Sequence, residues 1–125
     1  MPGGHGFGRG RGGGRRRLFF LESSLLVLLL REPGYGYSLT DGLQEFGFDP
    51  EQYDVSIIYR ALRDLEAMGL VSDTWDDKSL GPPRRVYTIT PDGKAALDTW
   101  IEGLRQNREE IEKLEAAYRA AKEKT

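Results

Sequence analysis

The apolar positions divide the chain into three short helical segments, a pair of strands and one long helix. The stretch 18–31 is apolar nearly all round and ends before Pro33 and Gly34. This pattern predicts a buried helix that a second subunit covers in part. A second helix is predicted over residues 38–46, because apolar side chains recur there at helical spacing and Gly47 follows as a stop.

A third helix is predicted to begin after Asp54, whose carboxylate is a favourable N-cap, and to end at Gly69. One face of this helix is apolar and is expected to be core: Val55, Ile58, Leu62 and Leu65. The opposite face is polar and charged: Ser56, Arg60, Arg63 and Asp64. That face is either a binding surface or a solvated charged surface.

Two segments alternate between apolar and polar residues and predict strands over 70–75 and 84–89. The residues between them, 76–83, include the sequence Gly-Pro-Pro and predict a loop. The strands should therefore form a β-hairpin. On the second strand, one face carries Arg84, Val86 and Thr88, and the other carries Arg85, Tyr87 and Ile89.

The last segment predicts a long helix that starts at Thr90 and Pro91, a hydroxyl N-cap followed by proline at the first helical position. It extends to about residue 122, a length of about 45 Å. Two series of residues seven apart form a seam typical of paired helices: Leu97, Leu104, Ile111 and Tyr118, with Trp100, Asn107, Leu114 and Ala121 between them. We expect this seam to dimerise, with Asn107 setting its register. The alternative is an amphipathic helix that folds onto its own domain.

Charge is distributed unevenly along the 125 residues, although the net charge is only −2. Residues 1–17 hold five arginines, eight glycines and no acidic residue, whereas the remainder has a net charge of −7. The first segment is expected to be disordered when free, as an arm for nucleic acid or as a solubilising tail. The predicted organisation is a tail over 1–17, a folded domain over 18–90 and a dimerisation helix over 91–125.

Several classes of protein are disfavoured by what the chain contains. It has no cysteine, and its single histidine, His5, lies in the Gly/Arg segment, so we expect no metal and no cofactor. The longest apolar stretch, 18–30, is short and contains Glu22, which argues against a membrane span and for a cytoplasmic protein. The acidic residues of the long helix have no nucleophile or phosphate loop beside them, so an enzyme is not expected.

The order helix, helix, helix, hairpin, long helix predicts a mainly α fold with a small β-hairpin, a winged helix-turn-helix carrying a long C-terminal dimerisation helix. In this fold the third helix enters the major groove of double-stranded DNA and the hairpin, or wing, contacts the backbone or minor groove. Ser56 and Ile57 could reach base edges, with Ile57 meeting a thymine methyl group. Arg60 and Arg63 could read guanine or bind phosphate.

Three motifs resemble those of the PadR family of bacterial transcriptional regulators. They are Gly-Tyr-Gly-Tyr-Ser-Leu at 34–39, Ile-Tyr-Arg-Ala-Leu-Arg-Asp-Leu-Glu-Ala-Met-Gly-Leu-Val at 58–71, and Gly-Pro-Pro-Arg-Arg-Val-Tyr-Thr-Ile-Thr-Pro-Asp-Gly at 81–93. The resemblance covers about residues 18–105 and is closest to the subgroup with a single C-terminal helix. It implies a homodimer that binds a palindromic operator and represses transcription. The Gly/Arg tail and Ile57 depart from the family pattern.

The resemblance also implies roles for individual residues. Tyr37 and Ser38 would contact phosphates, and Tyr59 would pack the third helix or touch the DNA backbone. Base readout would fall to Arg60 and Arg63, and wing contacts to Arg84, Arg85 and Tyr87.

Some PadR-like proteins sense hydrophobic drugs at the dimer centre, which suggests a hydrophobic or aromatic effector for this chain. Trp100 and Phe19 are the candidate pocket residues, and Phe19 and Phe20 also join the predicted dimer interface. Ordinary interface packing is the alternative interpretation of these aromatic residues. Two other functions stay open: a small-molecule sensor, and a nucleic-acid binder led by the Arg/Gly tail.

Overall fold

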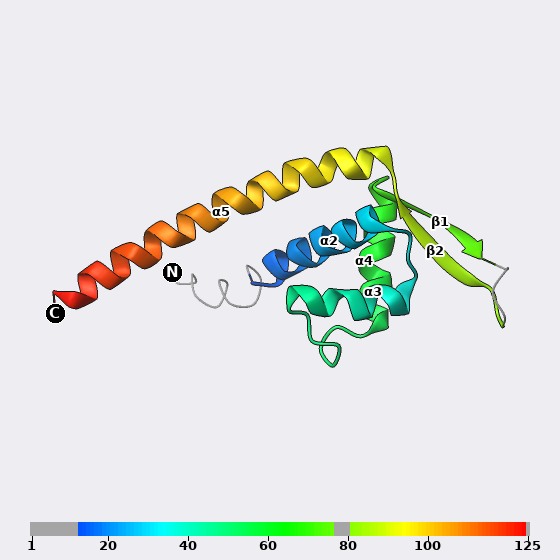
Figure 1. Ribbon diagram of the computed structural model, residues 1–125, viewed down its shortest axis with the longest axis horizontal. Helices are drawn as coiled ribbons and strands as arrows, with labels where there is room; N and C mark the ends of the chain where they lie inside the picture. Colours follow the sequence, from blue (N-terminus) through cyan, green and yellow to red (C-terminus); the bar gives the residue numbers. More distant parts are fainter. Residues whose placement is uncertain (1–12, 77–80, 125) are drawn as a thin grey trace, which may run out of the picture.

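The computed structural model describes residues 13–76 and 81–124, and it has the predicted element order (Figure 1). Three helices and a 3-10 turn are followed by a two-stranded antiparallel hairpin and a long final helix. The elements are α2 (Gly13–Arg31), α3 (Gly36–Gly42), η2 (Leu43–Phe46), α4 (Val55–Ala67), β1 (Val71–Asp76), β2 (Arg84–Ile89) and α5 (Pro91–Glu123). The predicted winged helix-turn-helix fold is confirmed.

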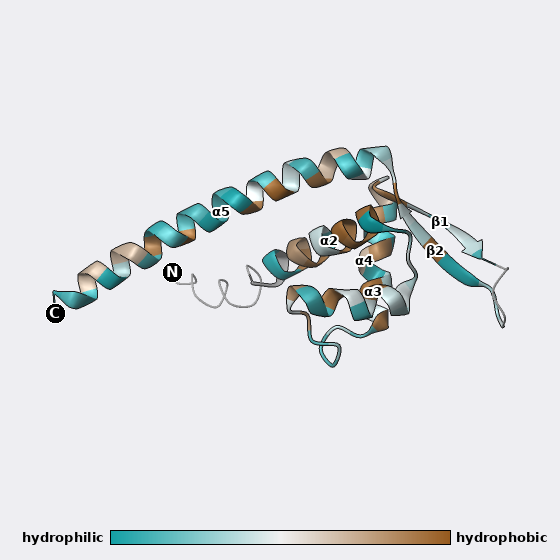
Figure 2. Cartoon of the chain, in the orientation of Figure 1, coloured by the Kyte–Doolittle hydropathy of each residue, from teal (hydrophilic) through white to brown (hydrophobic). Residues whose placement is uncertain are grey.

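Helix α2 is the centre of the core, as its nearly continuous apolar surface predicted (Figure 2). It packs against α3, α4, β2 and the start of α5. The side chains with less than 2% exposure include Leu25 and Leu26 of α2, and Ile58, Leu62 and Leu65 of α4. Val55, expected in the core, is only half-buried, and Ala61 is buried on α4 instead.

The start of α2 corrects the predicted boundary of the tail. The helix begins at Gly13, five residues earlier than expected, so residues 13–17 are helical. Arg17 donates from Nε to the Tyr53 hydroxyl at 2.9 Å, and its guanidinium lies 5.5 Å from the Phe48 ring centre and 5.4 Å from that of Tyr53. These contacts hold the start of α2 against the turn before α4. The rest of the predicted tail, residues 1–12, lies outside the described residues.

The predicted helix caps are confirmed. The Asp54 carboxylate accepts from the backbone N–H groups of Ser56 and Ile57, and the Thr90 hydroxyl accepts from the N–H of Gly93.

The second helix differs from its prediction. Helix α3 starts two residues earlier than expected. Its last turn tightens into the 3-10 turn η2, after which Gly47 adopts a φ of 90°.

The hairpin is tied to the helical body by backbone hydrogen bonds. Its register runs from Val71 opposite Ile89 to Asp76 opposite Arg84. Gly34, in the turn between α2 and α3, exchanges two backbone hydrogen bonds with Tyr87, at 3.1 and 2.7 Å. The wing is therefore anchored on the element that precedes the helix-turn-helix.

Helix α5 starts on the body and then extends beyond it (Figure 1). Leu97 is 4% exposed and belongs to the core, and Trp100 is half-buried against it. Leu97 is thus covered by its own chain, which differs from the expectation that it lies in a dimer interface, whereas Trp100 stays partly exposed. Farther along, Ile111, Leu114 and Tyr118 are exposed. No described helix is long and apolar enough to cross a membrane.

Candidate nucleic-acid interface

Helix α4 presents two unpaired arginines on its outward face. Its amphipathic sequence puts Ile58, Leu62 and Leu65 in the core, which leaves Arg60 and Arg63 exposed on the opposite side. Within the described chain, neither guanidinium group takes part in a hydrogen bond or an ion pair. These two side chains can therefore contact a ligand without first breaking an internal contact.

The N-terminus of α4 has its polar groups already engaged. Asp54 accepts from two backbone N–H groups and from the Ser56 hydroxyl at 2.7 Å. These hydrogen bonds, led by the one from the Ser56 side chain, lower the pKa of Asp54. Ser56 stays exposed, whereas Ile57 is half-buried and packs against the core, so only part of the Ile57 side chain is accessible.

The start of α3 forms one edge of the candidate interface. Tyr37 is 71% exposed, the most exposed aromatic side chain of the described residues. Ser38 is exposed as well, but its hydroxyl is used locally: it accepts from the Tyr35 N–H at 3.0 Å and donates to the Tyr35 carbonyl at 2.8 Å. The Ser38 hydroxyl therefore closes the first turn of α3.

The wing carries two arginines that are each held by an aromatic ring. The guanidinium carbon of Arg84 lies 4.2 Å from the Tyr35 ring centre, and that of Arg85 lies 4.5 Å from the ring centre of Trp75. Arg85 also forms an ion pair with Asp73. Cation–π stacking and ion pairing restrict both side chains, so they are pre-oriented.

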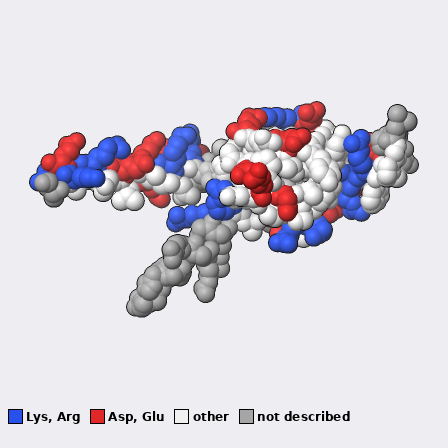
Figure 3. All heavy atoms as spheres, turned by 90° about the horizontal axis from the view of Figure 1, so that it is seen from below, with Lys and Arg blue, Asp and Glu red and all other residues white. Residues whose placement is uncertain are grey.

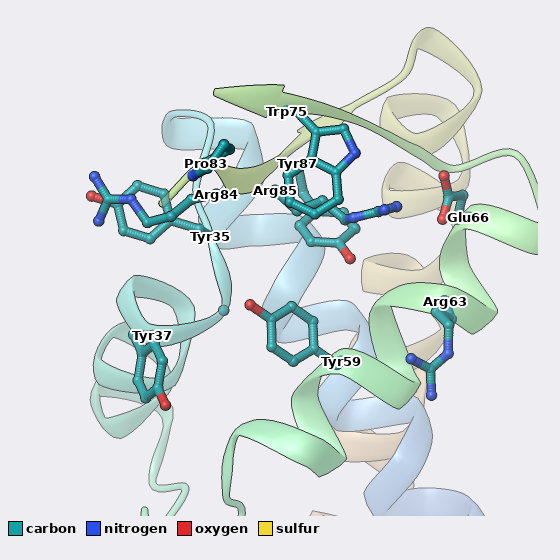
Figure 4. Close-up of a pocket in the computed structure, with 11 residues that line it drawn as sticks. Tyr35, Tyr37, Tyr59, Arg63, Glu66, Trp75, Pro83, Arg84, Arg85 and Tyr87 are labelled. Carbon is teal, nitrogen blue, oxygen red and sulfur yellow. The ribbon is translucent and has the colours of Figure 1, made fainter. Parts of the chain in front are cut away.

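A pocket of about 520 Å³ separates the wing from α4 (Figure 4). Tyr59 and Tyr87 point their hydroxyl groups into it, Trp75 and Arg85 form its wing side, and Glu66 comes from α4. The remaining lining residues are Tyr35, Gly36, Tyr37, Arg63, Pro83 and Arg84. Aromatic rings thus line the pocket between the exposed face of α4 and the wing.

Tyr87 lies on the wing strand β2, as predicted, but its side chain is buried. It is 2% exposed and packs in the core, with its ring centre 6.4 Å from that of Tyr59. Burial, with the nearby charge of Asp73, raises the pKa of its phenol. Tyr59 is half-buried and fits over Gly36, where an added Cβ would lie 2.6 Å from the ring. Both tyrosines shape the pocket.

Basic side chains gather at the wing end, although the body is acidic. Viewed from below, Lys and Arg atoms lie at the wing end and along one edge of the body, while acidic atoms form separate clusters among uncharged atoms in the middle of this face (Figure 3). An anionic partner therefore meets a locally favourable surface on the side of α4 and the wing.

A family model described as the transcriptional regulator PadR-like family matches residues 25–99, more than half of the chain. The chain belongs to the PadR-like family of transcriptional regulators. This membership confirms the resemblance found in the sequence motifs. Together with the winged-helix fold, it assigns the chain to DNA-binding regulation of transcription.

Solved structures agree with the PadR-like family. A conserved protein of unknown function, described as a potential transcriptional factor, is 38% identical with a TM-score of 0.70, over 82% of this chain and 90% of that one. A PadR-like transcriptional regulator from Bacillus cereus is 29% identical with a TM-score of 0.65, over 75% and 89%. A relative known by its sequence, an uncharacterized protein from Lysinibacillus sphaericus, is 28% identical over 82 residues, 66% of this chain and 75% of that protein.

Four residues of this PadR-like interface were missed from sequence alone: Tyr35, Glu66, Asp73 and Trp75. All four line the pocket or contact its residues. Tyr35 lies within the quoted Gly-Tyr-Gly-Tyr motif, and Trp75 is an exposed aromatic at a strand end, so both had a signal in the sequence. The acidic pair had none, because acidic side chains are not expected on a surface that binds DNA.

A second groove, of about 880 Å³, lies between α2 and α5. Phe19 lines it and stacks on Trp100 with ring centres 5.1 Å apart, so the two predicted pocket residues are neighbours. Phe20 also lines the groove but stacks on Phe48 at 5.5 Å. The exposed part of α5 completes it with Ile101, Leu104, Asn107 and Ile111, among others.

Proposed function

We propose that this PadR-like regulator is a repressor that binds an inverted-repeat DNA operator as a homodimer. The observation that carries the proposal is the pair of unengaged arginines, Arg60 and Arg63, on the outward face of α4. A helix that presents such side chains beside a wing is suited to the major groove, where arginine reads guanine through two hydrogen bonds. The similarity to a PadR-like transcriptional regulator from Bacillus cereus supports a role in transcription.

Each predicted contact residue receives a role that fits its exposure. Arg60, Arg63 and Ser56 face the bases, and the accessible part of Ile57 meets a thymine methyl group. Tyr37 and Ser38 approach phosphates at the start of α3, and Arg84 and Arg85 do so from the wing. Tyr59 and Tyr87 support this surface from below, through the aromatic wall of the pocket.

A footprint on DNA upstream of the gene tests the readout. Arg63→Ala is expected to cost about 1–3 kcal/mol of specific binding if Arg63 contacts a base. Arg119→Ala, on the far part of α5, is the matched control and should leave binding unchanged. Equal weakening on random DNA would make Arg63 a phosphate contact, and absence of any protection at low salt would refute DNA binding by this surface.

We assign dimerisation to the part of α5 beyond the body, and treat 18–90 as the DNA-binding domain and 91–125 as the dimerisation helix. Ile111, Leu114 and Tyr118 are 55%, 70% and 60% exposed, a row of apolar side chains that the described chain leaves uncovered. Leu104 and Asn107 continue this seam toward the body, where Phe19 and Phe20 flank it. A second copy of the helix would bury the row.

The dimer is tested by adding one charge at two positions of α5. Leu114→Asp, in the seam, is expected to shift the protein to monomer in analytical ultracentrifugation. Ala116→Asp, on the outer side of the same turn, is the control and should leave the dimer intact. A monomeric wild-type protein at micromolar concentration would refute the assignment.

The groove between α2 and α5 is our candidate site for a hydrophobic or aromatic effector. Its volume lies in the range of small-molecule sites, and Phe19 gives it an aromatic wall backed by Trp100. In a Trp75→Phe variant, the fluorescence of Trp100 alone reports on binding. Titration with planar hydrophobic dyes should quench it, and no response at saturating dye would remove the effector site.

A further inference from the structure

An acidic pair lies inside the surface to which we assign DNA binding. Asp73 of β1 forms an ion pair with Arg85 of β2, which lies two residues before Tyr87, the residue opposite Asp73. Glu66, in the last turn of α4, lines the pocket, and its carboxyl group and that of Asp73 shift each other's pKa. Asp73 therefore contacts Arg85, and Arg85 in turn stacks on Trp75.

The ion pair leaves Arg85 able to bind a second anion. Only its Nη1 contacts Asp73, and no hydrogen bond within the described residues uses its Nε or Nη2. The Asp73 side chain is 12% exposed, whereas that of Arg85 is 40% exposed. Asp73 thus holds the guanidinium from the inner side, and the remaining N–H donors are available to a phosphate oxygen.

The two carboxyl groups can lie together because Glu66 holds its proton more tightly than a free glutamate. Its hydrogen bond to Asp73, then partial burial and the Asp73 charge, raise the pKa of Glu66, while the same hydrogen bond lowers that of Asp73. The C-terminal end of α4 carries a partial negative charge that acts in the same direction. The other groups that face the pair are Arg85 and Tyr87 of β2.

We propose that Asp73 is a positioning residue for DNA binding: it holds Arg85 of the wing against Trp75. In such a complex, α4 occupies the major groove and the wing lies over the neighbouring groove. The DNA backbone between these two grooves must therefore cross the pocket between α4 and the wing. Arg85 lies at that crossing, so a fixed guanidinium meets its phosphate without losing further freedom. This inference rests on the proposed function of α4 and the wing.

The test uses the sign of an electrostatic effect. Removing an acidic charge near DNA ordinarily strengthens binding, because less negative charge opposes the phosphates. We expect the opposite for Asp73→Asn in the full-length protein: about fivefold weaker operator binding at constant salt, the scale of a partly exposed ion pair. Asp64→Asn on α4 removes an equal charge away from Arg85 and should bind as tightly as the wild type or more tightly.

A double-mutant cycle separates positioning from a general loss of structure. Asp73→Asn should weaken binding in the wild-type background but not in an Arg85→Ala background, where there is no guanidinium to hold. The thermal midpoints of all variants are measured in parallel.

Two outcomes overturn the inference while leaving the proposed function intact. One is tighter operator binding by Asp73→Asn than by the wild type, and the other is equal weakening in both Arg85 backgrounds. Failure of the wild-type protein itself to bind DNA would instead refute the proposed function. The two failures are therefore distinguishable in a single set of titrations.

Discussion

Glu22 makes the stability of the fold depend on pH in an unusual direction. It lies in the middle of the most buried helix, α2, and is 7% exposed. Burial, and secondarily the negative charge of Asp64 on α4, raises the pKa of Glu22 to about 6 from its ordinary value of 4.5. The folded state therefore disfavours the charged carboxylate, and the glutamate stabilises the fold less at neutral pH than at acidic pH.

The magnitude follows from the two pKa values. A carboxyl group whose pKa rises on folding contributes most below its unfolded pKa, and that contribution is lost as the pH passes through the folded pKa. The rise from 4.5 to about 6 corresponds to a loss of about 2 kcal/mol, complete above about pH 7. Relaxation of the fold around a buried charge lowers such a cost, so we expect about 1 kcal/mol.

Glu22→Gln isolates this effect, since glutamine has nearly the same shape and carries no charge. Urea unfolding followed by circular dichroism, at fixed protein and salt concentration, should show a gain of about 1 kcal/mol at about pH 7.5 and almost none near pH 4.5. Asp64→Asn removes the secondary cause and should give a smaller gain with the same pH dependence. A loss of stability in Glu22→Gln at about pH 7.5, or a gain that is equal at both pH values, would show that the reasoning is wrong.

Three other substitutions test the packing of the interface. Gly93→Ala would place a Cβ 2.1 Å from the Leu70 carbonyl oxygen, so we expect a loss of about 1–3 kcal/mol in the free energy of unfolding, measured by urea titration. Asp54→Ala removes the N-cap of α4 and should cost about 1 kcal/mol in the same titration. Gly36→Ala must displace the Tyr59 ring and should weaken operator binding in a gel-shift titration, with Gly103→Ala, where the added Cβ meets nothing, as the control.

The element order could be predicted because its signals are local. Asp54 and Thr90 each satisfy backbone N–H groups of the next turn, and their side chains make those contacts as expected. The family motifs lie on the same elements, within the residues 25–99 that the family model matches. The start of α2 was less predictable, since glycines argue against a helix, and the contact of Arg17 with a turn more than thirty residues away is not visible locally.

Side-chain partners within the interface depend on tertiary geometry. The sequence alternation put Arg85 and Tyr87 on one face of β2, but it did not say that Tyr87 would be enclosed by the body. The ion pair of Arg85 with Asp73 requires the hairpin register, and a loop as long as 76–83 leaves that register open. The seam of α5 was likewise continuous in sequence, whereas the body buries its first member, Leu97, and partly covers Trp100.

The length of α5 that no other element supports has a consequence for how folding and association are coupled. Of its 33 residues, only Gly93 and Leu97 are buried, and every described residue after Leu104 is exposed. In water, only the intrinsic helix propensity of such a segment stabilises its helical conformation, and this propensity is marginal. We therefore expect its amide protons to exchange with deuterium within seconds in dilute protein and far more slowly as concentration rises. Protein concentration would then determine what fraction of the molecules has this part of α5 folded and dimerised, and so what fraction can bind both halves of an operator.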